Sequence, residues 1–175
     1  MTSAPPLPRQ VVELTRIPER HLFADRNVVI VEAALLHGLG STEIAALNAG
    51  DVDLARRCFR RPRSKAWLPL HTSHWASWHR LTESADPSRP LCQSKSGRRM
   101  TRVDIWRVLR RVGIEGGLQR ALHSRRARKW VGHALARRER VDPASLALAM
   151  GVSDLRAIAA YLPTGATWSF PTQAV

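Results

Sequence analysis

The chain has 175 residues, of which 44% are apolar, and it carries 28 Lys and Arg against 14 Asp and Glu. This apolar share excludes a disordered polycation, and no apolar run approaches the roughly 20 residues that a membrane-spanning helix needs. The opening MTSAPPLPRQ lacks the basic and hydrophobic regions of a secretory signal. Two cysteines, Cys58 and Cys92, are too few for a disulfide framework, so we expect reduced thiols in a cytoplasmic protein.

The positive charge is concentrated in the middle of the chain. Residues 56–140 hold 23 basic and 5 acidic side chains, whereas residues 1–55 hold 4 basic and 7 acidic, and residues 141–175 hold one basic and two acidic. Arginine, whose guanidinium forms paired hydrogen bonds with phosphate, supplies 25 of the 28 basic side chains. A generally basic surface would spread this charge evenly, so its concentration favours a polyanionic partner, most simply nucleic acid.

The first elements predicted along the chain are an irregular arm and a buried helix. Prolines indicate an irregular arm over residues 1–20. The stretch 25–36 is apolar on nearly every side, as in a buried helix. Gly38 and Gly40 then favour a helix end followed by a tight turn.

The next segment changes from helix to sheet. Ser41 and Thr42 offer an N-cap for a helix over 41–50, with Glu43 well placed in its first turn. Short alternating stretches interrupted by Pro62 then predict a small antiparallel sheet. These stretches are 51–54, 57–61 and 66–70.

The second half of the chain is predicted to be helical around a polar loop at 83–99. Thr101 and Asp104 form a capping-box pattern, Asp142 precedes a proline at the first helical position, and Ser153 offers an N-cap for the last helix. The expected helices are 71–81, 101–113, 122–138, 143–150 and 154–162. An apolar stripe on the second of them comprises Val103, Trp106, Val108 and Leu109. We therefore expect an α+β domain over 21–163, mostly helical with a small antiparallel sheet, and a tail over 164–175.

A cluster of histidines in the sequence HTSHWASWH suggests a metal site. Its members are His71, His74 and His79, with Trp75 and Trp78 between them. Imidazole binds transition metals, but no cysteine or carboxylate pattern accompanies the cluster and the spacing matches no strong zinc signature. A helix with buried tryptophans and exposed histidines explains the pattern more simply, so we expect no metal.

Three motifs occur in an order typical of a known family. They are HGLGSTEIAALNAGDVD at 37–53, HSRR at 123–126 and MGVSDLRAIAAY at 150–161. Together they resemble the catalytic domain of the tyrosine recombinases, the phage integrase family, over roughly residues 20–163. The resemblance implies that family's catalytic-domain fold and a double-stranded DNA substrate.

The resemblance also implies a chemistry and its residues. In the family, a tyrosine hydroxyl attacks a DNA phosphodiester and forms a 3′-phosphotyrosine without metal or cofactor. Tyr161 matches this nucleophile, since it lies ten residues after Gly151. His123 and Arg126 match the family's His-x-x-Arg element, and Lys65 lies between two predicted strands where the family keeps its hairpin lysine.

Three family positions are occupied by other residues. Gly40 stands where the family has its first arginine, Ala127 where it has histidine, and Val152 where it has histidine or tryptophan. One arginine aimed at a transferring phosphate can be worth about 10³–10⁵ in rate. The departures therefore predict an impaired or inactive site, unless His37 or a distant arginine reaches the phosphate.

Three hypotheses of function follow. The first is a DNA-binding regulator or accessory factor of a mobile element, whose surface basic residues neutralise phosphates. These residues are Arg102, Arg107, Arg110, Arg111, Arg125, Arg128 and Lys129. The second is a minimal active recombinase that cleaves and rejoins DNA through Tyr161. The third is an interaction module that pairs with a second copy or with a full-length recombinase through its C-terminal tail.

Overall fold

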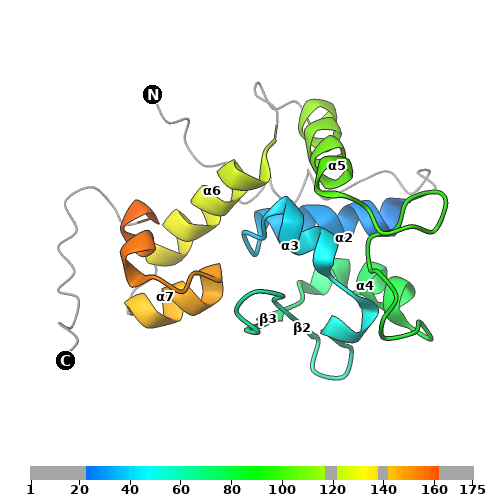
Figure 1. Cartoon of the computed structure of the whole chain (residues 1–175), viewed down its shortest axis with the longest axis horizontal. Helices are drawn as coiled ribbons and strands as arrows, with labels where there is room; N and C mark the ends of the chain where they lie inside the picture. Colours follow the sequence, from blue (N-terminus) through cyan, green and yellow to red (C-terminus); the bar gives the residue numbers. More distant parts are fainter. Residues whose placement is uncertain (1–22, 117–121, 138–141, 162–175) are drawn as a thin grey trace.

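A computed structural model describes residues 23–116, 122–137 and 142–161 of the chain. The fold is mostly helical with one small sheet, as the sequence predicts (Figure 1). The α-helices are α2 (Ala24–Leu35), α3 (Ser41–Ala46), α4 (Trp75–Thr82), α5 (Arg102–Glu115), α6 (Ser124–Ala136) and α7 (Pro143–Met150). The 3₁₀ helices are η1 (Ala49–Asp51), η2 (Thr72–His74) and η3 (Leu155–Tyr161), and the strands are β1 (Val52–Asp53), β2 (Cys58–Arg60) and β3 (Trp67–Pro69). The predicted arm and tail lie outside the described residues.

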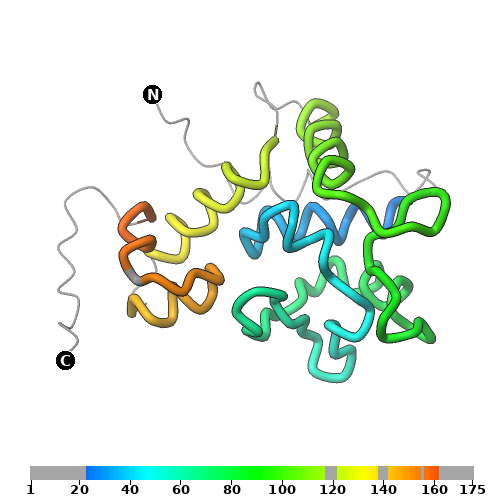
Figure 2. The backbone as a smooth tube through the Cα atoms, viewed as in Figure 1, coloured from blue at the N-terminus to red at the C-terminus, as the bar shows by residue number. Residues whose placement is uncertain are grey.

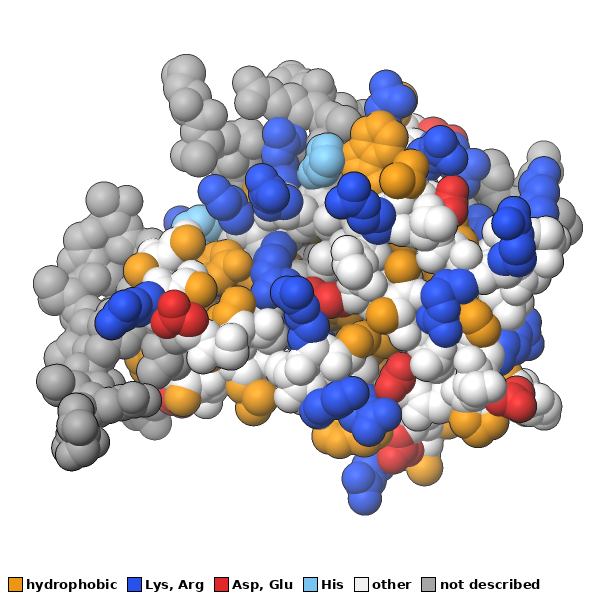
Figure 3. Space-filling model, viewed as in Figure 1, with side chains coloured by type: hydrophobic (Ala, Val, Ile, Leu, Met, Phe, Trp, Pro, Cys, Tyr) orange, Lys and Arg blue, Asp and Glu red, His pale blue; other side chains and the backbone are white. Residues whose placement is uncertain are grey.

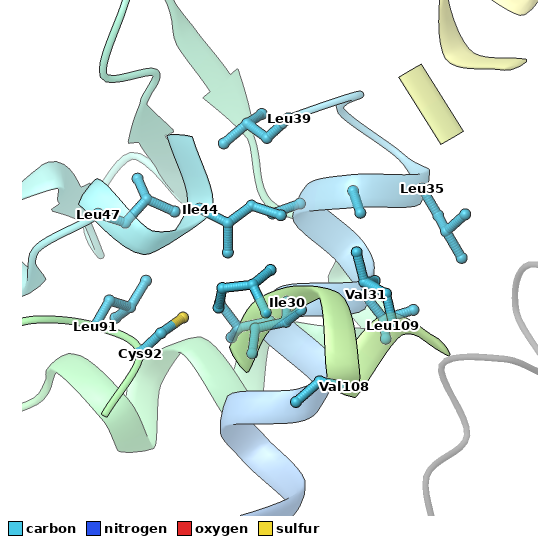
Figure 4. Close-up of a cluster of buried hydrophobic side chains, with 14 of the residues drawn as sticks. Ile30, Val31, Leu35, Leu39, Ile44, Leu47, Leu91, Cys92, Val108 and Leu109 are labelled. Carbon is cyan, nitrogen blue, oxygen red and sulfur yellow. The ribbon is translucent and has the colours of Figure 1, made fainter. Parts of the chain in front are cut away.

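Helix α2 is the centre of the main core. It is buried along most of its length because α4, α5 and α6 all pack against it. Ile30 and Val31 of α2 meet Val108 and Leu109 of α5 (Figure 4). Full burial of an aliphatic side chain contributes roughly 1.5–3 kcal/mol, so this apolar stretch supplies much of the stability of the fold.

The sheet is antiparallel in the order β1-β2-β3. Phe59 at its centre pairs with Val52 on one side and Leu68 on the other. Its ring is fully buried and stacks on Trp78 of α4 with 4.9 Å between ring centroids. The strands lie where the sequence predicts them but are shorter than expected. The contact between Phe59 and Trp78 attaches the sheet to the main core.

The C-terminal elements form a second, smaller core. Helices α6, α7 and η3, yellow to orange-red in Figure 2, pack on one another through buried apolar side chains. Asp142 caps α7 as predicted, accepting the backbone N–H groups of Ala144 and Ser145, and Gly151 ends α7 with a left-handed φ of 61°. The last helix is 3₁₀ rather than α, and Asp154, not Ser153, accepts an N–H of its first turn.

Two other local predictions were wrong. The N-cap of α3 is Gly40 rather than Ser41 or Thr42, because the Glu43 carboxylate turns back to accept the Gly40 N–H at 2.9 Å. On α5, Val103 of the predicted stripe is 42% exposed. The buried face of that helix keeps Val108 and Leu109 of the predicted stripe and adds Ile105, Val112 and Gly113.

The histidine cluster is also arranged differently from the expectation. His74 is buried, and its Nδ1 lies 3.0 Å from Oε2 of Glu32. Glu32 also accepts the Trp78 indole N–H, at 2.8 Å. No group of three or more metal-ligand side chains occurs within the described residues. In the same part of the chain, the helices are too short or too polar to cross a bilayer.

Candidate active site and nucleic-acid interface

A buried carboxylate joins two arginines between the two cores. The Arg61 guanidinium donates from Nε to Oε1 of Glu43 at 2.9 Å and from Nη2 to Oε2 at 3.1 Å. Arg128 of α6 donates from Nη1 to the same Oε2, also at 2.9 Å. Burial alone would raise the pKa of Glu43, but the Arg61 and Gly40 hydrogen bonds and the two positive charges hold it below its ordinary value. We call these three residues the Glu43 cluster.

Arg61 is fully buried and all of its donors are paired. Besides the two bonds to Glu43, Nη1 donates to the carbonyls of His37 at 3.2 Å and Ala149 at 2.6 Å, and Nη2 donates to that of Gly38 at 3.3 Å. A guanidinium carries five N–H donors, so none is left for another acceptor. Arg61 therefore connects the sheet, the turn before α3 and the end of α7.

Tyr161 completes the site from η3. Its hydroxyl accepts a hydrogen bond from Nε of Arg128 at 3.3 Å. The ring lies directly on Gly132, where a Cβ would come within 2.3 Å of Cδ1 of the ring. Nδ1 of His133 is 2.8 Å from the Tyr161 carbonyl oxygen. The tyrosine is thus buried against α6 with its hydroxyl next to the Glu43 cluster.

Comparison with known proteins identifies the family. The model of the phage integrase family matches residues 7–165. The chain belongs to this family. One curated relative, the tyrosine recombinase XerC of Roseiflexus castenholzii, is 29% identical over 125 residues, which is 63% of this chain and 40% of the relative.

Solved structures of phage integrase relatives share the fold. XerA recombinase superposes with a TM-score of 0.73 at 18% identity, covering 90% of this chain and 57% of that one. The Tn1549 transposon integrase in complex with transposon right end DNA gives 0.68 at 16% identity, covering 94% and 62%. This integrase-family chain therefore spans about 40% to 62% of the length of these relatives.

Of the four family positions predicted to be retained, only Tyr161 lies at the Glu43 cluster of this integrase-family chain. Lys65 is exposed in the β2–β3 turn with a left-handed φ of 57°. His123 is exposed before α6, and its Nε2 accepts the Trp106 indole N–H at 3.0 Å. Arg126 is half-buried, and within the described residues its side chain makes no hydrogen bond or ion pair.

The sequence prediction missed three residues of this site. The sequence places Glu43 at a helix start and Arg61 in a strand, and it assigns no role to His133. A signal for the first pair does exist, since a carboxylate on the inward face of a short apolar helix needs a buried cation. The sequence does not show which of 28 basic side chains supplies that cation.

The three departures from the integrase family pattern have distinct surroundings. A Cβ at Gly40 would meet only Oε2 of Glu43, at 3.5 Å, and its φ of −74° suits any residue. Ala127 is fully buried in the main core, and Val152 packs against the second core. Nε2 of His37 faces Oε1 of the buried Glu32 at 3.4 Å.

Most of the predicted DNA-binding side chains of this integrase-family chain are exposed. Lys and Arg gather along the upper edge of the view, over α5 and α6 (Figure 3). The exposed members are Arg102, Arg107, Arg110, Arg111, Arg125 and Lys129. Arg128 differs, because its guanidinium points inward and donates to the Glu43 carboxylate and the Met150 carbonyl.

Proposed function

We propose that this member of the phage integrase family binds double-stranded DNA without cutting it, as a cytoplasmic regulator or accessory factor of a mobile element. One observation carries the proposal: every N–H donor of the buried Arg61 is already bonded within the protein. Arg128, whose Nε donates to the Tyr161 hydroxyl, uses four of its five N–H donors within the protein, for Glu43, Gly38, Met150 and Tyr161. Cleavage of a phosphodiester needs such donors for the charge on the phosphate.

The rate factors associated with the missing donors support the loss of cleavage. Removing one preorganised donor costs about 10²–10³ in rate, and losing a phosphate-directed arginine about 10³–10⁵. Gly40 supplies no such arginine, and the nearest buried substitute, Arg61, is held by Glu43. Ala127 and Val152 add two further positions without a ring donor. These effects do not simply add, but we expect them together to slow strand cleavage severely.

The exposed arginines support DNA binding. Arg102, one turn before Trp106 in α5, and Arg125 and Lys129 of α6 are exposed, and the Trp106–His123 hydrogen bond links α5 to the start of α6. Side chains of this kind neutralise phosphates and release counterions. Structural neighbours include XerH site-specific recombinase bound to its difH substrate, at a TM-score of 0.68 and 16% identity.

The test is retention of sheared DNA from the source of the protein, sequenced before and after denaturation in detergent. We expect fragments held by the native protein and released by detergent, with the same result for Tyr161→Phe. Detergent-resistant fragments that disappear in Tyr161→Phe would instead support a recombinase that acts through this tyrosine. Because Cys58 and Cys92 are both free thiols, the protein can be purified under reducing conditions without breaking a disulfide.

A second measurement separates DNA binding from the tail hypothesis. Deleting residues 164–175 leaves the proposed DNA surface intact, so retention of DNA should persist. Loss of DNA retention together with loss of a co-purifying recombinase or a second copy would favour the interaction module.

A further inference from the structure

The exposed side of α5 carries a groove apart from the Tyr161 site. A hollow of about 410 Å³ lies between the first turn of α2, the loop that leads into α5, and α5 itself. Phe23 and Met100 give it an apolar floor, and Arg26, Lys95, Arg107 and Arg111 line it. A second hollow of about 260 Å³ shares Arg107 and Arg111 and extends to Ile114, which is 57% exposed.

Arg26 is a fixed cation in the lining of this groove. Its Nη1 donates to the Gln93 carbonyl at 2.7 Å, and its Nε and Nη2 donate to Oδ1 of Asn27 at 3.3 and 3.0 Å. Its guanidinium carbon lies 4.3 Å from the centroid of the Phe23 ring. The positive charge is thus held against the apolar floor without a carboxylate partner of its own within the described residues.

The other cations of the groove are only loosely paired. Arg107 reaches Oδ1 of Asp104 at 3.3 Å, and Arg111 is 3.9 Å from Oε1 of Glu115. Both arginines are exposed, so pairs of this kind contribute little and can exchange partners. The first hollow holds four cations against one carboxylate, Asp104.

We propose that this groove binds an acidic segment of a partner protein that carries an apolar anchor residue. The concave site is lined by the apolar side chains of Phe23, Met100 and Ile114, which can receive the apolar side chain of a peptide, whereas the phosphate backbone of a duplex is convex and polar. The four cations of the first hollow outnumber its one carboxylate, Asp104, so the groove attracts the acidic side chains of such a segment. Amphipathic peptides bind grooves of this type through spaced anchors. Because Tyr161 does not line the groove, this inference holds whether or not Tyr161 cleaves DNA.

The test measures fluorescence anisotropy of a labelled twelve-residue peptide that alternates Glu with Leu and Phe, using the full chain. Arg107→Glu with Arg111→Glu should weaken binding at least about tenfold, since two rim attractions become repulsions. A charge-matched double variant, Arg102→Glu with Arg125→Glu, should change peptide binding less than about twofold. All four side chains are exposed, and urea denaturation of each double variant checks that it is folded before peptide binding is compared.

A gain of binding provides a second readout. Glu115→Gln removes the carboxylate that competes for Arg111 and should tighten the peptide complex. The proposal fails if the acidic peptide does not bind, if a peptide with Lys in place of Glu binds equally, or if both double variants weaken it alike. It also fails if pyrophosphate or duplex DNA displaces the peptide and Arg107→Glu with Arg111→Glu abolishes duplex binding, which would make the groove a phosphate site.

Discussion

At the scale of single residues, the contact between Tyr161 and Gly132 determines how α6 and η3 pack. Alanine normally stabilises a helix interior relative to glycine by about 0.5–1 kcal/mol. At Gly132 the added methyl would lie 2.3 Å from the tyrosine ring, so the ring must move. We predict that Gly132→Ala lowers the free energy of unfolding by about 1–3 kcal/mol, measured by urea denaturation.

A double variant shows whether the tyrosine ring is the cause. In a Tyr161→Ala background the obstacle is gone, so Gly132→Ala should become neutral or stabilising by its helix propensity. Equal destabilisation in both backgrounds would locate the clash elsewhere.

Glu32 is the second residue with a measurable signature. It is fully buried, and burial alone would raise its pKa. Hydrogen bonds from His37, His74, the His71 backbone and Trp78 outweigh burial and lower the pKa from 4.5 to about 2. The folded-state pKa lies below the unfolded one, so the resulting stabilisation is complete above pH 4.5 and is lost as the pH falls toward 2.

We therefore predict an acid-sensitive stability that depends on Glu32. The shift corresponds to about 3 kcal/mol in total, of which about 2 should be lost between pH 6 and pH 3. Urea unfolding at these two pH values should show a correspondingly smaller fall for Glu32→Gln, which is also less stable at pH 6. A fall of the same size in both proteins would contradict the assignment.

At the scale of elements, the Glu43 cluster joins the sheet to α3, α6 and α7. Removing one partner of a buried ion pair leaves an uncompensated charge and typically costs about 3–5 kcal/mol. We predict a loss of this size for Arg61→Met, measured by urea denaturation. Arg60→Met, one residue earlier at the end of β2, breaks the more exposed pair with Asp51 at 3.1 Å and should cost no more than about 1 kcal/mol.

Local signals of the sequence predicted most elements correctly. The capping pair of Thr101 and Asp104 and the Asp142–Pro143 start are satisfied by neighbouring backbone groups, so they can be identified without a fold. The site could not be predicted in the same way. Arg61 is 18 residues from Glu43 and 88 from Ala149, and such partners are set by how β2, α3 and α7 pack. Lys65 matched a family position in sequence, but the hairpin leaves it exposed.

At the scale of the whole molecule, the net charge of +14 is arranged so that the interior arginines stabilise the fold and the exposed ones face solvent. Only the exposed group can release counterions on binding DNA. We predict that the logarithm of the DNA association constant falls linearly with the logarithm of salt concentration. Replacing Arg102, Arg125 or Lys129 by Gln should each reduce the magnitude of this slope by about 1.

Arg89→Gln is the matched control for this prediction. It removes one positive charge from the exposed loop after α4. The Arg89 guanidinium donates to the Gln93 side chain at 3.2 Å and does not belong to α5 or α6. Its slope should equal that of the unmodified chain, because net charge alone does not set the number of phosphates contacted. A slope lowered equally by all four substitutions would mean that DNA is held by the general field of the protein, and a slope unaffected by any of them would place the DNA on another face.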